Sequence, residues 1–389
     1  MDGLKVSLLT FEPNFNNTWT TEQVAAERKN LAEENITWHC LPYHKKPSIP
    51  ATLYDIFCGA RFAARLSRRE DIDIFHARSH VSALMGAIAK KISRRKPKLI
   101  FDIRGFLPEE YVDAEIWKEN SLQYLSLKWI EKSLLRISDG FVILTQNAQK
   151  VLFPNCVDTD ESGRPFEVIP CCVDFSRFKQ IESISREEAK RNLGLAKRKI
   201  FVYVGSLGGF YLTEEMADFL AVAYKEHPNV FLMILTQSPI EMITLLLRSR
   251  GIPEKDFLVK KVNSDDLPLY LRASDVAISF IKPTFSKRSS SPTKIAEYLA
   301  AGVPIIFNSG VGDLDNMLGG ENVGAIVENF TTADYKKALK TIFILMQDDD
   351  LRARCEQIAL KYFALEQVGG VRYRKIYKRL MIESSSHKL

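Results

Sequence analysis

One stretch is more informative than any other in this sequence: Ser286-Lys287-Arg288-Ser289-Ser290-Ser291-Pro292-Thr293-Lys294-Ile295-Ala296-Glu297-Tyr298-Leu299-Ala300. A serine followed by a proline predicts a helix start, because Ser291 can cap open backbone N–H groups and Pro292 lacks one. A helix N-terminus carries partial positive charge and free N–H groups, so it suits a phosphate. Glu297 follows Thr293 on the same helix face, about 6 Å further along the axis.

The side chains around this helix start favour a nucleotide. Lys287, Arg288 and Lys294 add positive charge, and the neighbouring serines add hydroxyl donors. The offset to Glu297 is close to the distance between a nucleotide's diphosphate and its ribose hydroxyls, which a carboxylate can accept from. The stretch predicts a clamp for a nucleoside diphosphate. The alternative is a well-capped amphipathic helix whose lysines are only solvated, and this segment alone leaves both open.

The whole chain has the composition of a globular protein with two domains. It has 389 residues, of which 46% are hydrophobic and 26% charged, and a mild net charge of +6 that does not predict a nucleic-acid partner. Its six cysteines form no CxxC pair, which is typical of reduced thiols in a cytosolic protein. We find no signal peptide and no apolar run of about 20 residues, so we expect a cytoplasmic protein whose membrane contacts are peripheral.

The sequence alternates short β-branched runs with longer helical ones, which predicts parallel sheets covered by helices. The expected strands are residues 4–11, 36–41, 72–77, 98–103, 140–144 and 166–169, then 199–204, 230–235, 257–261, 275–280, 303–307 and 323–327. Two consecutive series predict an α/β protein of two doubly wound, Rossmann-like domains. We place them at residues 1–180 and 190–365, joined between 170 and 199 and followed by a helical, basic tail.

Open parallel sheets bind ligands where strands end, and three such ends in the second domain have turn-forming residues. Residues 202–210 run from a buried strand into a turn containing Gly205 and Ser206, whose glycines permit close approach of a phosphate or sugar. Residues 236–238 follow a second strand. Gly312 and Asp313 follow a third. Each is, taken singly, also typical of an ordinary strand-to-helix turn.

Polar side chains also end two strands of the first domain. Asp102 and Arg104 lie at the end of the 98–103 strand, and the arginine can grip a phosphate or carboxylate. The acids Glu109 and Glu110 follow, and we expect them to accept from sugar hydroxyls. The residues that end the 72–77 strand on the acceptor side are His76 and Arg78, with His80 next. A single such histidine is as typical of the core.

Missing motifs argue against several enzyme classes. The sequence has no HExxH, paired CxxC or clustered acidic ligands, so we expect no metal site. The missing GxSxG and GxxxxGK[ST] argue against an α/β hydrolase and a P-loop enzyme. No GxGxxG follows the first strand, which argues against a dinucleotide-dependent dehydrogenase.

Two basic segments of the first domain predict a membrane-facing surface. The segments contribute Arg61, Arg65, Arg68, Arg69, Lys90, Lys91, Arg94 and Arg95. Leu53, Phe57, Ala60 and Leu66 recur along the first segment, and a basic amphipathic surface of this kind can lie on anionic lipid. The alternative is that these apolar residues pack the helix on its sheet.

With these pieces in order, the chain resembles the GT-B glycosyltransferases, specifically family 4 of the retaining type. Residues 291–304, which read Ser-Pro-Thr-Lys, then Glu-Tyr-Leu-Ala-Ala-Gly-Val-Pro, are similar to the donor-binding signature of that family. Residues 168–178 resemble its inter-domain segment, and 203–208 its glycine turn. Residues 273–277 match the strand before the donor helix. The tail at about 366–383 resembles a helix that crosses back to the first domain.

The resemblance implies a function and roles for several residues. It implies transfer of a sugar, with retention and without a metal or other cofactor, from a nucleoside diphosphate sugar to a glycan or lipid-linked acceptor in the synthesis of a cell-surface polysaccharide or glycoconjugate. Glu297 would hold the ribose, and Asp102 and Arg104 would face the donor sugar and acceptor. The diphosphate would be held by Lys287, Ser290, Ser291, Thr293 and Lys294 over Gly205 and Ser206, with Gly312 and Asp313 beside them.

The sequence departs from the family pattern at two places. Ser289 stands where many members have a glutamate that contacts the transferred sugar, and Phe210-Tyr211-Leu212 replaces the usual basic residues after the glycine turn. Lys287 and Arg288 are placed to supply the lost charge. Two alternatives therefore stay open: a nucleotide-sugar 2-epimerase of the same shape, and a non-catalytic homologue that keeps the clamp.

Overall fold

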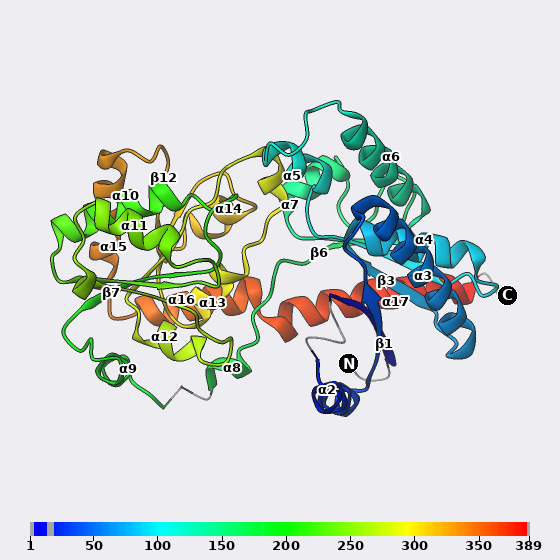
Figure 1. The fold of residues 1–389 in the computed structure, drawn as a ribbon, viewed down its shortest axis with the longest axis horizontal. Helices are drawn as coiled ribbons and strands as arrows, with labels where there is room; N and C mark the ends of the chain where they lie inside the picture. Colours follow the sequence, from blue (N-terminus) through cyan, green and yellow to red (C-terminus); the bar gives the residue numbers. More distant parts are fainter. Residues whose placement is uncertain (1–3, 14–18, 180, 182, 387–389) are drawn as a thin grey trace.

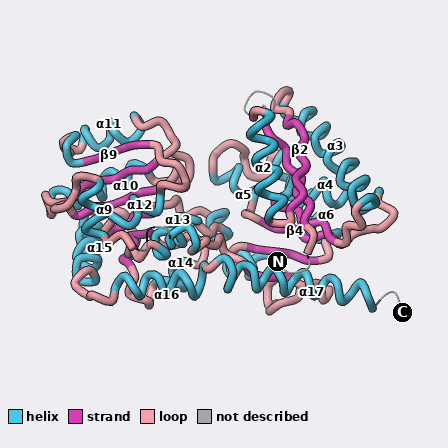
Figure 2. Tube along the Cα trace, turned by 90° about the horizontal axis from the view of Figure 1, so that it is seen from below, coloured by secondary structure: helices cyan, strands magenta, loops and turns pink. Residues whose placement is uncertain are grey.

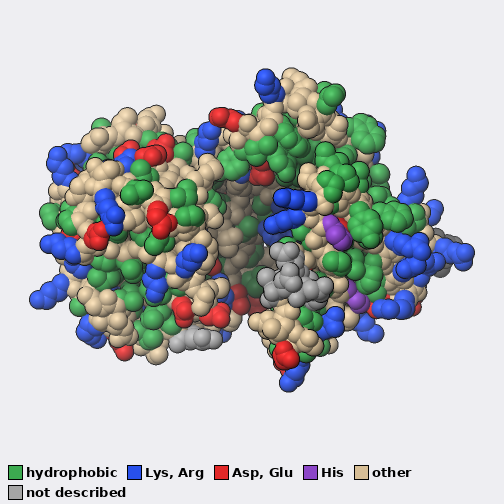
Figure 3. All heavy atoms as spheres, in the orientation of Figure 1, with side chains coloured by type: hydrophobic (Ala, Val, Ile, Leu, Met, Phe, Trp, Pro, Cys, Tyr) green, Lys and Arg blue, Asp and Glu red, His purple; other side chains and the backbone are tan. Residues whose placement is uncertain are grey.

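We analysed a computed structural model, which describes residues 4–13, 19–179, 181 and 183–386. Two α/β lobes lie side by side along the longest axis of the molecule (Figure 1). Each lobe has parallel strands with helices packed around them, so the expected fold of two Rossmann-like domains is confirmed. A deep hollow separates the lobes over part of the face seen in Figure 3.

The strands of the N-terminal domain form two parallel sheets in the described residues. β1 (Val6–Pro13) pairs with β2 (Ile36–Tyr43) along its whole length. The other four strands are β3 (Ile74–Arg78), β4 (Lys98–Ile103), β5 (Gly140–Ile143) and β6 (Phe166–Val168), in the order β3-β4-β5-β6. The sequence predicted a single series of six, whereas hydrogen bonding separates the first two strands from the rest.

The helices of this domain include three short ones that the strand–helix pattern did not predict. They are α2 (Thr21–Glu33), α3 (Ser48–Arg69), α4 (Ser79–Ile92), α5 (Leu107–Asp113), α6 (Leu122–Ile137), α7 (Gln146–Leu152) and α8 (Ser176–Lys179). The unpredicted α5 and α7 each follow the carboxyl end of a strand, β4 and β5. Their first turns therefore lie at the sheet edge that faces the other lobe (Figure 1).

The C-terminal domain has a single parallel sheet in the order β12-β11-β10-β7-β8-β9. Its strands are β7 (Lys199–Val204), β8 (Val230–Leu235), β9 (Phe257–Lys260), β10 (Val276–Ser279), β11 (Ile305–Asn308) and β12 (Gly324–Val327). Central strands such as β8 and β10 are buried at every residue, as expected for a sheet covered on both faces. The strand order reverses between β7 and β10, so ligand binding is expected beyond their carboxyl ends.

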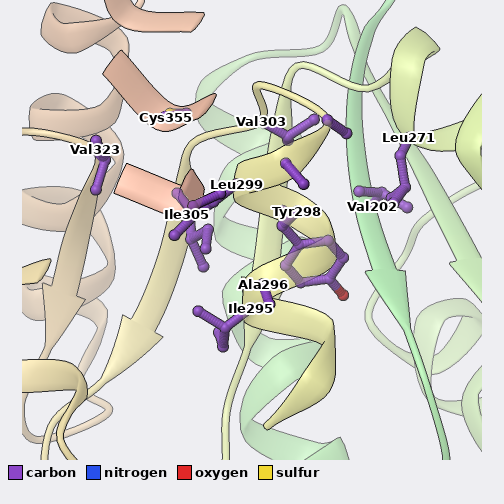
Figure 4. Close-up of a cluster of buried hydrophobic side chains, with 14 of the residues drawn as sticks. Val202, Leu271, Ile295, Ala296, Tyr298, Leu299, Val303, Ile305, Val323 and Cys355 are labelled. Atoms are coloured by element: carbon purple, nitrogen blue, oxygen red, sulfur yellow. The ribbon is translucent and has the colours of Figure 1, made fainter. Parts of the chain in front are cut away.

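The helices that cover this sheet include α13, on which the sequence argument depends. They are α9 (Arg186–Asn192), α10 (Thr213–Glu226), α11 (Glu241–Ser249), α12 (Leu267–Ala273), α13 (Thr293–Ala300), α14 (Leu314–Leu318), α15 (Thr332–Leu345) and α16 (Leu351–Phe363). Ile295, Tyr298 and Leu299 of α13 are fully buried in one core cluster (Figure 4). The Tyr298 hydroxyl also accepts from the Val204 N–H at 2.7 Å, which fixes α13 to the end of β7.

Two crossings of the chain join the domains and lie side by side. The Val173 N–H donates to the Phe363 carbonyl at 2.8 Å, and the Leu365 N–H donates back to the Val173 carbonyl at 3.0 Å. The chain then continues through a π-helical turn, Leu365–Gly370, into α17 (Val371–Ser386), which runs beneath the N-terminal domain (Figure 2). Its Ile376 and Leu380 are fully buried in a cluster with core residues of that domain.

The described part of the chain contains neither a candidate membrane span nor a candidate metal cluster. There, no helix combines the length and the apolar character that crossing a bilayer requires. The same residues contain no group of three or more His, Cys, Asp or Glu side chains arranged to hold a metal ion.

Candidate active site

The candidate site lies where the strand order of the C-terminal sheet reverses. Gly205 follows β7, and the segment 280–292 follows β10 and leads into α13. The carboxyl ends of these adjacent strands therefore bring together the glycine turn and the serine-rich stretch, which are about 80 residues apart in the sequence.

Lys294 lies directly against the glycine turn. A Cβ at Gly205, which has φ +134°, would be 2.8 Å from Lys294 Nζ. The ammonium lies over the rings of Tyr203 and Tyr211, at 4.2 and 4.1 Å from their centroids, and donates to the Tyr203 hydroxyl at 3.1 Å. Burial lowers the pKa of Lys294 from 10.5 to about 7, although Glu297 favours the charged form. An anion beside Nζ would stabilise that charge.

The start of α13 differs from the predicted one by a residue. Pro292, rather than Ser291, is the N-cap residue, and no side chain caps the helix. The Ser291 hydroxyl instead accepts from the Cys171 N–H of the inter-domain segment at 3.0 Å. Ser290 is half-buried, while Thr293, in the first turn, is exposed, as is Ser206 in the glycine turn.

Glu297 is held in place by an arginine that the sequence reasoning missed. Its carboxylate accepts from Arg177 Nη1 at 2.9 Å. Arg177 Nη2 also donates to the carbonyl and the hydroxyl of Ser264, at 2.7 and 2.9 Å, in the loop after β9. Arg177 comes from α8, beyond the first crossing, so only its place in the inter-domain segment could have indicated this role.

Lys287 belongs to the C-terminal domain but contacts both domains. It lies in a 3-10 turn, Phe285–Ser289, and is buried. Its Nζ lies 3.7 Å from the centroid of the Phe210 ring in the glycine turn and 2.8 Å from Glu110 Oε1 of α5. Lys287 thus brings a second positive charge to the glycine turn.

The rest of the serine-rich stretch lies against the N-terminal domain. The Asp113 carboxylate of α5 accepts from the Ser286 N–H at 2.8 Å, and Ser289 Oγ accepts from the Phe106 N–H at 3.1 Å. Ser286 and Ser289 are buried. Both domains therefore contribute residues to the site.

Gly312 and Asp313 also lie at the contact between the domains. The Asp313 carboxylate accepts from the Gln146 and Asn147 N–H groups, at 2.6 and 3.0 Å, at the start of α7. Burial raises the pKa of Asp313. Gly312, at φ +52°, leaves no room for a side chain, because a Cβ would be 1.9 Å from the Ser290 carbonyl. Asp313 therefore binds α7.

A cavity of about 460 Å³ lies beside this contact. Its lining includes Asn147 and Lys150 of α7, together with Arg288 and Gly310 of the C-terminal domain. Arg288 also lies over the ring of Phe285, with its guanidinium carbon 5.3 Å from the centroid.

On the side of the N-terminal domain, Asp102 is buried and bound within the protein. Its Oδ2 lies 3.3 Å from His76 Nε2 and accepts from the Tyr373 hydroxyl of α17 at 3.4 Å. The other ring nitrogen of His76 is 2.6 Å from the Tyr377 hydroxyl. Asp102 thus links α17 to the ends of β3 and β4.

Arg104 lies between Asp102 and the inter-domain segment. Its Nη1 is 3.6 Å from Asp102 Oδ1, and its Nη2 donates to the Cys171 sulfur at 3.3 Å. Burial opposes its charge, but the Asp102 carboxylate outweighs this, so the pKa of Arg104 lies above its ordinary value. Arg104 is therefore charged and lies close to Ser291, which binds the backbone of the same Cys171.

The remaining acceptor-side residues do not form one cluster. Glu109 Oε1 binds Lys128 Nζ at 2.9 Å and the Tyr124 hydroxyl at 3.2 Å, and so turns towards α6. Arg78 is exposed at the start of α4. His80 is buried and pairs with Glu131 at 3.0 Å, whereas His76, for which a core position was the alternative, has a side chain that is 24% exposed.

The sequence matches two family descriptions in succession. Residues 20–177 match "Glycosyltransferase Family 4", and residues 185–362 match "Glycosyl transferases group 1". Together they span most of both domains. Among curated protein sequences, none matches this chain.

Solved structures share the fold over nearly the whole chain. The sucrose-phosphate synthase from Thermosynechococcus elongatus is 14% identical, with 97% of this chain and 99% of that one covered at a TM-score of 0.69. A glycosyltransferase from Rickettsia africae is 15% identical, with 97% of this chain and 99% of that one covered at a TM-score of 0.68. HepE from Anabaena, solved in complex with UDP-glucose, is 13% identical, with 93% of this chain and 89% of that one covered at a TM-score of 0.65.

Proposed function

This chain belongs to the GT-B glycosyltransferases of family 4 type, and we propose that it transfers a sugar, with retention, from a nucleoside diphosphate sugar to a hydroxyl of a glycan or lipid-linked acceptor. Its product would be a polysaccharide or glycoconjugate of the cell surface. HepE has been solved with UDP and with UDP-glucose, which supports a UDP-sugar as the first donor to test.

One arrangement supports this function best, namely two lysines that both contact the glycine turn. Lys294 lies against Gly205, and Lys287 lies on the ring of Phe210 in the same turn. Both are buried; Lys287 is paired with Glu110, whereas the charge of Lys294 costs desolvation free energy that a bound anion would offset. A diphosphate between them, at the start of α13, would relieve that cost.

The same charges would promote the chemical step. As the bond to the leaving diphosphate breaks, negative charge builds up on its oxygens and positive charge on the sugar. Fixed cations and helix N–H groups stabilise the leaving group without a metal ion. We therefore expect Lys287→Met to lower turnover by about 100-fold, the scale seen for the loss of one such donor.

We further propose that the acceptor attacks from the face that the diphosphate leaves, with a phosphate oxygen taking the acceptor proton. No side-chain nucleophile is then needed, and the anomeric configuration is retained. The domain contacts made by Lys287 and the serine-rich stretch would exclude water from the reacting sugar.

The epimerase hypothesis gains no support from the histidines. Both ring nitrogens of His76 are near protein partners, and His80 is buried in its pair with Glu131. Incubation of the donor alone tests this alternative, since an epimerase would form an epimer. A non-catalytic homologue would bind the nucleotide but turn over no donor.

The experiment that tests the function has two stages. A thermal-shift screen against UDP, GDP, ADP, CDP and dTDP identifies the base, because binding raises the midpoint by mass action. The matching sugar nucleotides are then incubated with hydroxyl acceptors in the presence of EDTA, and the anomer of the product is determined by NMR. Binding without any transfer, or full dependence on an added metal, would contradict the proposal.

We also propose that the helix layer of the N-terminal domain contacts an anionic membrane. The structure places large apolar side chains on its surface. On α3, Ile49, Leu53 and Phe57 are 70%, 60% and 62% exposed, at a spacing that puts them on one face. Ala60 and Leu66 are buried, so only these two of the four predicted residues pack the helix on the domain.

A second apolar face lies on α6 of the same layer. Leu122, Leu125 and Trp129 are 81%, 48% and 70% exposed, again on one helix face. α4 packs between α3 and α6, and Figure 3 shows apolar side chains along this side of the lobe. Exposed apolar patches of this kind mark interaction sites.

The charges on the same layer favour a bilayer with anionic headgroups over a second protein surface. On α3 the apolar residues are followed by Arg61, Arg65 and Arg68, all exposed. Lys91 and Arg94 are also exposed. The other predicted bases are bound within the domain: Arg69 to Glu70, Lys90 to Asp139 and Arg95 to Asp71.

Sedimentation with vesicles tests this contact. The protein should bind vesicles that contain phosphatidylglycerol but not pure phosphatidylcholine. Leu53→Ser with Phe57→Ser should weaken binding about tenfold or more, because two exposed apolar side chains that would enter the bilayer are lost. A protein that forms dimers through this face and ignores both vesicles would overturn the proposal.

A further inference from the structure

We propose that Glu110, from the N-terminal domain, accepts hydrogen bonds from the hydroxyls of the transferred sugar and so contributes to donor specificity. The inference rests on the proposed function, since it assumes that a sugar nucleotide occupies the site. It assigns to the donor a residue that the sequence placed on the acceptor side.

The position of Glu110 supports this role. Its Oε1 is 2.8 Å from Lys287 Nζ, and that ammonium lies on the ring of Phe210 in the glycine turn. The carboxylate therefore contacts a lysine that we assign to the diphosphate, to which the transferred sugar is attached. Oε1 also lies 3.1 Å from where a Cβ of Gly105 would be, so the turn after β4 passes close beneath it.

Glu110 is also still accessible. Its side chain is 30% exposed, whereas that of Lys287 is only 10% exposed. Among the described residues, Lys287 is the cation that pairs with Glu110, and a bound diphosphate would share it and so weaken this ion pair. Sugar hydroxyls, which are neutral donors, can then satisfy its oxygens at normal hydrogen-bond distances.

The other carboxylates near the site are bound elsewhere. They are Asp102, Glu109, Asp113, Glu297, Asp313 and Asp315, of which Asp315 lines the cavity beside α7 and accepts from the Gly310 N–H at 2.9 Å. Asp113 binds the Ser286 N–H, and Asp313 binds the start of α7. Glu297 is held by Arg177, towards the loop after β9.

The two remaining acids belong to the N-terminal domain. Asp102 is 3% exposed and is bound to His76 and Tyr373, and Glu109 is bound to Lys128. Unlike these acids, Glu110 contacts Lys287, the lysine assigned to the diphosphate, and is partly open to the cleft.

Ser289 cannot take over this role in the arrangement observed. It is 2% exposed, and its hydroxyl accepts from the Phe106 N–H at 3.1 Å and donates to the Ser286 carbonyl at 2.6 Å. Both bonds are within the protein. Glu110 of the facing domain can supply the acceptor that Ser289 does not offer.

A comparison of UDP with UDP-glucose tests the inference, because UDP lacks the sugar. If the screen selects GDP instead, the pair is GDP and GDP-mannose. In Glu110→Gln, the Kd for the sugar nucleotide should rise about tenfold or more relative to that for the free diphosphate, the effect of losing a hydrogen bond to a charged group. Glu110→Asp, which keeps the charge but withdraws it, should show the same selective loss.

Asn147→Ala is the matched control. Asn147 donates from its side chain to the Gly312 carbonyl across the same contact between the domains, at 2.6 Å. If Glu110 only holds the domains together, both variants should weaken the two ligands by equal factors, which would overturn the inference. An unchanged ratio in Glu110→Gln would do the same. If the wild-type protein binds neither pair, the proposed function itself fails.

Discussion

At Lys294, the burial that holds the side chain over Gly205 also opposes its charge. Its pKa is about 7, so the unliganded site gains or loses this charge around neutral pH. A diphosphate needs the protonated form. Below pH 7 the lysine is charged and the donor binds well, and above pH 7 each further pH unit removes about nine-tenths of the charged form.

We therefore predict that the donor KM is constant below pH 7 and rises by up to about tenfold per pH unit above it. The rise should end where the pH exceeds the pKa of Lys294 in the complex, which the bound diphosphate raises. Initial rates between pH 6 and 9 measure this. Lys294→Met should have a high KM without that rise. A wild-type KM that stays flat up to pH 9 would contradict the assignment of Lys294.

Arg177 positions the carboxylate that we assign to the donor ribose. Because Arg177 binds both Glu297 and Ser264, its loss should leave the Glu297 carboxylate, which is assigned to the ribose, without the contact that orients it. We expect Arg177→Ala to raise the donor KM about tenfold with little change in kcat, as for a group that only binds substrate. Glu297→Ala should do the same, and the double variant should be no worse than about the larger single effect. Additive losses would mean that the two act separately.

Single residues were predictable where a local pattern carried them. Lys294 and Glu297 follow from a helix start with a four-residue spacing, and Gly205 from a turn after a buried strand. Arg177 and Tyr211 were missed because their partners, Glu297 and Lys294, are more than 80 residues away in the sequence. No local pattern contains such contacts.

The glycine turn is the element on which the donor site depends. Gly205 has φ +134°, and a Cβ there would displace Lys294 Nζ. We predict that Gly205→Ala costs about 1–3 kcal/mol of stability through backbone strain and also lowers nucleotide affinity at least tenfold. Gly209→Ala is the control, since Gly209 is also left-handed, at φ +61°, but has open space around it. Calorimetry with UDP distinguishes the two, and equal affinities would contradict this account.

Elements were predictable to the extent that their burial is uniform. The strands 98–103, 199–204 and 230–235 have the predicted bounds, because both faces of each are covered and apolar residues fill most of each strand. α15 was missed, although Thr331 with Asp334 is a helix-start signal that could have shown it. The start of α13 shifted because Ser291 binds Cys171 across the domains instead of capping the helix.

At the scale of the whole molecule, α17 ties the end of the chain to the N-terminal domain. Leu380 is fully buried with Ile376 against Ile100, Val142 and Ile169. We predict that Leu380→Ala lowers the free energy of unfolding by about 2–5 kcal/mol, as for other leucines in closed cores. Urea unfolding measures this. Lys378→Ala, at an exposed position on the same helix, should change little, and equal effects would mean that α17 is not docked as described.

The two-domain architecture was predictable, but the contact between the domains was not. Two series of strands and helices predict two lobes, whereas Lys287 with Glu110, and Asp313 with α7, pair side chains from opposite lobes. Such pairs depend on how the lobes are oriented, which no periodicity records. The acceptor-side assignments stay predictions for the same reason.

The central claim is that the diphosphate binds at the start of α13, between Lys294 and Lys287. A crystal structure of the protein with its nucleoside diphosphate tests it most directly. We predict phosphate density within about 3 Å of the Thr293 and Lys294 N–H groups, above Gly205. Density for the nucleotide elsewhere, with this position filled by protein side chains, would contradict the account.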